Sequence, residues 1–142
     1  MKNKEYFDKA ISTLNKMGIK NEDIIVTGSI AFDIYGLLPE SHTIHDFDCI
    51  VNIKPEIANM IKFTSKVFKT DKCPSECGDN TAILEVNGIV LNIWWNAPNE
   101  IASVKFEGVG VKDIMSILEM KKKYKRDKDY KDIIEIAKMI LN

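Results

Sequence analysis

One stretch of this chain constrains its fold more than any other. The apolar run 24–26 is followed by Gly28-Ser29. Further along the chain, after a segment long enough for a short helix and a loop, come two carboxylates separated by one residue, Asp46 and Asp48. Glycine adopts backbone conformations and allows close approaches that other residues do not, so Gly28-Ser29 predicts a strand that turns into a short helix. Alternate residues of a strand point to one face, so the two carboxylates are expected to direct their oxygens to the same place.

These residue types suit a metal-bound phosphate. Two hard oxygen ligands on one face favour Mg²⁺ (or Mn²⁺), which takes phosphate oxygens as further ligands, so Asp46 and Asp48 are candidate metal ligands. Gly28 and Ser29 are candidate nucleotide-binding residues, because a hydroxyl and an N–H at a helix start favour anions. The alternatives are a plain strand-to-helix turn and a solvated strand end. Two acids on one face repel unless a cation or donors compensate, which favours the metal site.

The order and spacing of these residues resemble the nucleotidyltransferase superfamily of polymerase-β-type enzymes. Within it, the chain is most similar to a small bacterial and phage branch related to abortive-infection toxins. The matching pattern is a hydrophobic pair with Gly-Gly/Ser-x-Ala, then Tyr-Gly, then Arg-x-Thr-x-Asp-hydrophobic-Asp, which corresponds here to residues 24–31, 35–36 and 42–48. His42 stands where the pattern has arginine. It is either a plain loop residue or, when protonated, a phosphate contact.

A second match lies near the C-terminus. The segment 121–132, KKKYKRDKDYKD, resembles the Lys…Arg-x-Lys-Asp-x-x-Asp ending of that branch. The resemblance implies that Lys121, Arg126 and Lys128 contact the triphosphate or the acceptor. The alternative is a solvated helix surface, which is the usual role of a basic run.

The resemblance also implies a third carboxylate on a neighbouring strand, and here the chain departs from the pattern. The expected position, four residues beyond Gly88, is Asn92. An amide oxygen can ligate a metal, but an amide cannot take a proton from an acceptor hydroxyl. A two-residue Asn87-Gly88 turn would pair Glu85 with Val90 and place Glu85 on the same strand face as Asn92, as a substitute acid. The candidate catalytic residues are therefore Asp46, Asp48, Glu85 and Asn92.

Hydrophobic periodicity predicts one α+β domain over residues 1–142. Strands are expected at 24–26, 46–52, 82–86, 89–95 and 104–111, and helices at 4–17, 29–35, 55–68, 113–124 and 128–141. These elements predict a mixed, mostly antiparallel sheet of about four or five strands, with helices packed mainly on one face.

Composition restricts the class of protein further. The chain is 45% hydrophobic and 29% charged with a net charge of −1, which indicates neither disorder nor a membrane protein and gives no global case for nucleic-acid binding. Three cysteines without a visible targeting segment predict a cytoplasmic protein. Cys73 and Cys77 form a single Cys-x₃-Cys pair far from the histidines, and a structural zinc site is not expected.

Two functional hypotheses follow. In the first, the chain binds a Mg²⁺–nucleoside triphosphate and transfers a nucleoside monophosphate to a hydroxyl of RNA, protein or a small molecule. No second substrate domain is visible, so the acceptor site could depend on a homodimer or another protein. In the second, the chain is a weakened or inactive relative that acts as a nucleotide-binding, antitoxin-like or complex-forming partner. Asn92 favours the second hypothesis, whereas the intact Gly-Ser and Asp-x-Asp motifs favour the first.

Overall fold

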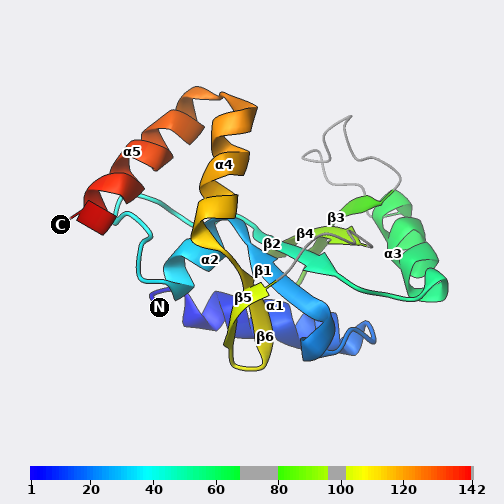
Figure 1. Cartoon of the computed structure of the whole chain (residues 1–142). Helices are drawn as coiled ribbons and strands as arrows, with labels where there is room; N and C mark the ends of the chain where they lie inside the picture. The colour runs from blue at the N-terminus through cyan, green and yellow to red at the C-terminus, as the bar shows by residue number, and fades with distance from the viewer. Residues whose placement is uncertain (68–79, 96–101, 142) are drawn as a thin grey trace.

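The structure, a computed structural model, describes residues 1–67, 80–95 and 102–141. Its elements, shown in Figure 1, are α1 (Lys4–Lys16), η1 (Asn21–Asp23), β1 (Ile24–Thr27), α2 (Gly28–Ile34), β2 (Phe47–Val51), α3 (Pro55–Val67), β3 (Thr81–Val86), β4 (Ile89–Trp95), β5 (Ala102–Phe106), β6 (Val109–Lys112), α4 (Ile114–Tyr124) and α5 (Asp127–Leu141). The polar, turn-rich segment 69–80 is predicted to be a loop, and all of it except residue 80, including Cys73 and Cys77, lies outside the described residues.

The strands form one mixed sheet in the order β3-β4-β2-β1-β6-β5. Three neighbouring pairs are antiparallel, β1 with β2, β3 with β4 and β5 with β6. The other two pairs, β1 with β6 and β2 with β4, are parallel. The α+β class and the mixed sheet are therefore confirmed, but the sheet has six strands and is larger than predicted.

The additional strand comes from the region 104–111, where the prediction of one continuous strand was wrong because β5 and β6 occupy it. The chain reverses at Glu107-Gly108, both with positive φ (49° and 85°), so β5 and β6 form a hairpin. A two-residue turn of this kind matches the twist of the flanking strands. The reversal places β6 beside β1, in the interior of the sheet, and leaves β5 at the edge.

One face of the sheet is buried beneath helices. The ring of Phe7 in α1 packs against Phe47 of β2 at 6.1 Å and against Phe106 of β5 at 5.3 Å between ring centroids. On the same face, Lys62 of α3 lies over the ring of Trp95. The prediction of helices on one face holds for α1 and α3, whereas residues of α4 and α5 line a cavity over the opposite face.

A buried carboxylate ties the start of α1 to α2. Asp33 is 2% exposed and accepts hydrogen bonds from the backbone N–H groups of Lys2 (2.9 Å) and Asn3 (2.8 Å), and from the Asn3 side-chain amide (3.0 Å). Three donors compensate the burial of this carboxylate. The short helix that begins at Gly28 is thereby fixed to the rest of the domain at its C-terminal end.

Within the described ranges 1–67, 80–95 and 102–141, none of the helices has the length and apolar character needed to span a bilayer.

Candidate functional site

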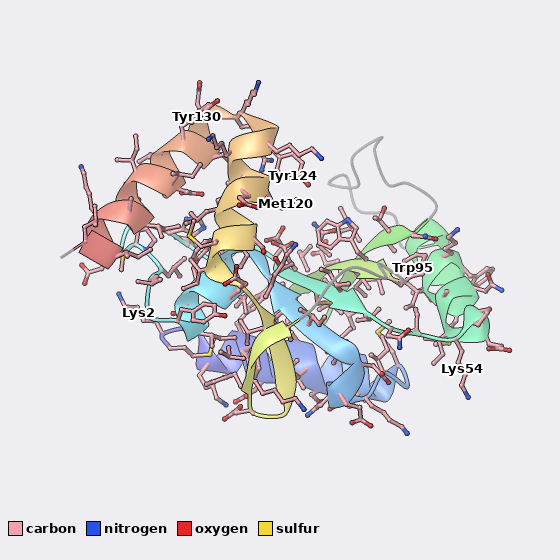
Figure 2. All side chains as sticks on the ribbon, viewed as in Figure 1. Lys2, Lys54, Trp95, Met120, Tyr124 and Tyr130 are labelled. Carbon is pink, nitrogen blue, oxygen red and sulfur yellow. The ribbon has the colours of Figure 1, made fainter. Side chains whose placement is uncertain are left out.

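A cavity of about 1020 Å³ lies over the second face of the sheet. Its floor comes from the ends of β1, β2 and β4, and its walls come from the segment 41–46 and from α4 and α5. Met120 and Tyr124, labelled in Figure 2, line the wall made by α4. All the predicted site residues except Glu85 line this cavity: Gly28, Ser29, Asp46, Asp48, Asn92, Lys121, Arg126 and Lys128. The fold therefore brings together residues that are up to 100 positions apart in the sequence.

Gly28 gives the Asp48 carboxylate its space. The glycine has φ of +68°, and a Cβ added there would overlap Oδ2 of Asp48. Thr27 lies opposite Asp48 in the β1–β2 register, so the turn into α2 begins directly beside the carboxylate. Both the left-handed backbone and the missing side chain are needed at this position.

A pair of glycine substitutions separates these two requirements. Gly36 also has positive φ (+73°), but a Cβ there would meet nothing within 4 Å. We expect Gly36→Ala to lower the free energy of unfolding by about 1–3 kcal/mol, which is the cost of placing a non-glycine residue at positive φ. Gly28→Ala should lose more, because it also displaces Asp48. Urea unfolding of the two variants measures the difference, and equal losses would mean that Gly28 has no role beyond its turn.

Asp48 is a carboxylate that the described protein groups only partly satisfy. Its Oδ1 atom is buried and has no hydrogen-bond partner among the described residues. Burial, together with the charge of the nearby Asp46, raises the pKa of Asp48 to about 7. A hydrogen bond from Asn92 and the charges of Lys121 and Lys128 act in the opposite direction. A buried oxygen without a donor is costly, so this atom is suited to an additional ligand.

The raised pKa predicts how stability depends on pH. The native state holds the Asp48 proton up to about pH 7, whereas an ordinary aspartate loses it near 3.8. The contribution of this group is therefore most favourable below the ordinary value, and it is lost as the pH rises toward 7. We expect the stability gain of Asp48→Asn over the wild type to be small at about pH 4 and to grow until about pH 7. Thermal melts at several pH values, without divalent cations, measure it; a gain independent of pH would contradict the assignment.

The donor set fits a divalent cation with oxygen ligands. Asp46 lies immediately before β2 and, like Asp48, lines the cavity, and the unpartnered Oδ1 supplies a free lone pair. The described residues contain no cluster of three His, Cys, Asp or Glu side chains that could hold a metal. Any cation here would therefore take two carboxylates, with an amide oxygen, waters or phosphate oxygens completing its coordination.

The position of the third acid is occupied by Asn92, which pairs directly with Asp48 in the parallel β2–β4 register. The predicted hairpin register is confirmed, because Glu85 pairs with Val90 and so shares a strand face with Asn92. The Glu85 side chain is nevertheless exposed and is absent from the cavity lining. The structure therefore does not bring Glu85 together with the other candidate catalytic residues.

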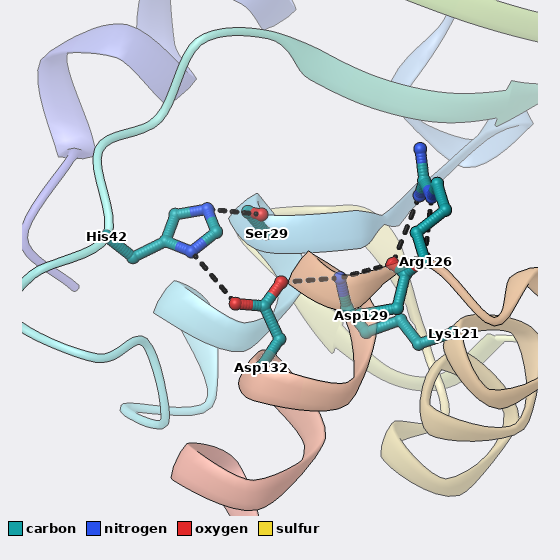
Figure 3. Close-up of polar contacts among 6 residues, drawn as sticks. All are labelled: Ser29, His42, Lys121, Arg126, Asp129 and Asp132. Carbon is teal, nitrogen blue, oxygen red and sulfur yellow. Dashed lines mark hydrogen bonds and ion pairs between the residues drawn. The ribbon is translucent and has the colours of Figure 1, made fainter.

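The basic residues reach the cavity from α4, from α5 and from the link between these helices, and two of them are already paired. Arg126 makes a two-point contact with Asp129, with Nε–Oδ2 at 2.6 Å and Nη2–Oδ1 at 3.1 Å. Lys121 Nζ lies 3.1 Å from Asp132 Oδ2 and 3.9 Å from Asp129 Oδ1 (Figure 3). Lys128 has no ion pair within the described part of the chain. Lys128 is therefore the predicted cation most available to a ligand.

Asp129 is the fixed centre of this arrangement. Its side chain is fully buried, and burial alone would raise the pKa of its carboxyl group. The hydrogen bonds and charge of Arg126, with the charge of Lys121, bring that pKa below its ordinary value. Asp129 stays ionised and orients both cations. Arg126 lies just before α5 and only three positions from Asp129, so their closeness in the sequence could have indicated this pair, whereas the contact with Lys121 joins two separate helices.

The contacts of His42 were not predicted from the sequence. Nε2 of His42 lies 3.0 Å from Oγ of Ser29, and Nδ1 lies 3.6 Å from Oδ1 of Asp132 (Figure 3). The imidazole therefore connects the turn at the start of α2 with α5. Asp132 is the last acid of the C-terminal motif, but no local signal in the sequence joins it to a histidine ninety positions earlier.

Comparison with known proteins identifies no relative: no family model, curated protein or solved structure matches the chain. The resemblance to nucleotidyltransferases therefore remains a hypothesis based on the motifs.

Proposed function

We propose that this chain binds a nucleoside triphosphate with Mg²⁺ or Mn²⁺ and transfers the nucleoside monophosphate to a hydroxyl acceptor. The observation that supports the proposal most is the buried, unpartnered Oδ1 of Asp48, beside Asp46 and the Gly28 turn. Stable folds rarely keep such an oxygen unpaired, and a cation that binds there would satisfy it.

The cavity offers suitable groups for each part of that substrate. Asp46 and Asp48 would hold the cation, which when bound neutralises phosphate charge and polarises the reacting phosphorus centre. Ser29, Lys121 and Lys128 would hold the phosphate oxygens, since they supply a hydroxyl and two cations at the same cavity. In the reaction, the acceptor oxygen bonds to the α-phosphorus, the bond to pyrophosphate breaks, and the hydroxyl proton is released.

The acceptor is proposed only by class, as a hydroxyl of RNA, protein or a small molecule. A homodimer or a second protein would complete the acceptor site, because the described residues form a single sheet domain. A cytoplasmic, toxin–antitoxin setting is part of the same proposal and rests on the motif resemblance alone.

A specific observation supports the second candidate, a nucleotide-binding protein with weakened chemistry. Asn92 stands directly opposite Asp48, and Glu85 does not reach the cavity. Such a site would keep its metal and phosphate contacts and lack a general base. It would then serve as a nucleotide sensor, an antitoxin-like protein or a component of a complex.

One screen tests both candidates. Each of the four nucleoside triphosphates is added with Mg²⁺ or Mn²⁺, and thermal stabilisation and pyrophosphate release are measured. The enzyme predicts both signals for at least one nucleotide, and the binding protein predicts stabilisation alone. Stabilisation that the cation does not increase, or no stabilisation with any nucleotide, would contradict both candidates.

A further inference from the structure

Ser29, His42 and Asp132 form a chain of contacts at the cavity: a hydrogen bond of 3.0 Å joins Ser29 to His42, and an ion-pair contact of 3.6 Å joins His42 to Asp132. The three side chains come from α2, from the segment before β2 and from α5, and each is partly or largely shielded, with His42 25% and Asp132 14% exposed. Lys121 contacts the other oxygen of Asp132, so the carboxylate is held between a lysine and the imidazole (Figure 3). The charged and titratable groups that line the same cavity as His42 are Asp132, Glu135, Lys128 and Lys131 of α5, Lys121 and Tyr124 of α4, Arg126 between these helices, Lys112 of β6, Asp48 of β2, and His45 and Asp46 of its own segment.

The carboxylate selects the tautomer of the neutral imidazole. The negative charge of Asp132, 3.6 Å from Nδ1, favours the neutral tautomer that carries its proton on Nδ1, and this tautomer leaves Nε2 as an acceptor. Nε2 then accepts the Ser29 hydroxyl proton across 3.0 Å. In that state the Ser29 hydroxyl has no proton left to donate to an anion in the cavity.

Protonation of His42 reverses the direction of this hydrogen bond. The imidazolium donates from both nitrogens, so Nε2–H points to the Ser29 oxygen and the Ser29 proton becomes available. The added positive charge also lies beside the cavity and remains balanced by Asp132. Both changes favour an anion at Ser29.

We propose that His42 is a proton-linked positioning residue that controls whether Ser29 donates to a phosphate group. Phosphate binding at Ser29 is then coupled to uptake of a proton by His42, and Asp132 fixes the orientation that makes the coupling possible. This inference rests on the proposed function in that it assigns Ser29 to the phosphate side of the nucleotide, but it requires no metal and no turnover.

The test measures binding of inorganic triphosphate, with a chelator to remove divalent cations, by calorimetry between about pH 5 and pH 8. The chain has two histidines, and both line the cavity, so the same substitution at His45 is a matched control for His42. His42→Gln remains neutral at every pH, His42→Arg remains charged, and His45→Gln makes the same change at the second histidine. The probe titrates in the same way for every chain, so ratios between chains remove its own pH dependence.

We expect the affinity of the wild type relative to His42→Gln to increase by roughly tenfold from the high to the low end of that range, as for one hydrogen bond to a charged group. His45→Gln should retain this increase. His42→Arg should hold its affinity at high pH, where the wild type loses it. Thermal melts check that each variant is folded.

A constant ratio between wild type and His42→Gln across the pH range would overturn the proposal, as would loss of the increase in His45→Gln. Absence of triphosphate binding by all chains would also overturn it. Each result is separable from failure of the proposed function. That function is measured with the cation present, through cation-dependent nucleotide stabilisation and pyrophosphate release, and it survives if those signals persist.

Discussion

Asp46→Asn combined with Asp48→Asn should abolish cation-dependent triphosphate binding and leave a folded domain that is more stable than the wild type at neutral pH. Binding falls because two charged oxygen ligands become neutral amides. The loss should exceed the roughly 10–100-fold that removal of an outer-shell partner costs at metal sites. Stability rises because the repulsion between the two carboxylates and the burial of the Asp48 charge, which together raise the pKa of Asp48, are removed.

Calorimetry with Mg²⁺ and the best triphosphate from the screen measures the first effect, and thermal melts without cation measure the second. Glu5→Gln combined with Asp8→Asn is the matched control, because it removes the same charge from the exposed side of α1. Unchanged triphosphate affinity in the Asp46/Asp48 variant would remove these residues from the site. A control that lost affinity equally would show that net charge alone governs binding.

Asn92→Asp should raise turnover if the chain is a transferase that lacks its third acid. Asn92 pairs with Asp48 in the β2–β4 register and lines the cavity, so the new carboxylate would stand where the acceptor hydroxyl can reach it. General-base assistance is typically worth about 10²–10⁴-fold, and the gain should fall within that range. Pyrophosphate release with a suitable acceptor is the measurement.

Glu85→Gln is the complementary variant. Its side chain is exposed and outside the cavity, so we expect this change to leave turnover unaffected. Loss of activity in Glu85→Gln would show that the acid function lies within the hairpin. If neither variant changes anything and the wild type is inactive, the transferase proposal fails and a binding protein remains.

Much of the local structure was determined by the sequence itself. Asn87-Gly88 specifies a two-residue turn, and the predicted pairing of Glu85 with Val90 followed from that turn alone. Gly28, where the sequence predicted that the strand turns into a short helix, begins α2 with a positive φ that glycine readily adopts. These features depend on the conformational preferences of neighbouring residues, which composition and spacing reveal directly.

The assembly of the sheet and of the cavity depended on contacts between distant residues. Glu107, a residue type that seldom adopts positive φ, forms the turn that separates β5 from β6, and only the pairing of β6 with β1 shows that the turn is there. The pKa of Asp48 depends on what buries it, because desolvation is a property of the packed structure.

The sequence by itself determined that a glycine turn, two carboxylates and a basic C-terminal segment occur in one α+β domain. Only the tertiary structure decided how they are used. It left Oδ1 of Asp48 without a partner, paired Lys121 with acids of α5, and joined Ser29 to Asp132 through His42. Side-chain contacts between separate elements depend on how those elements pack, and periodicity along the chain carries no record of that packing.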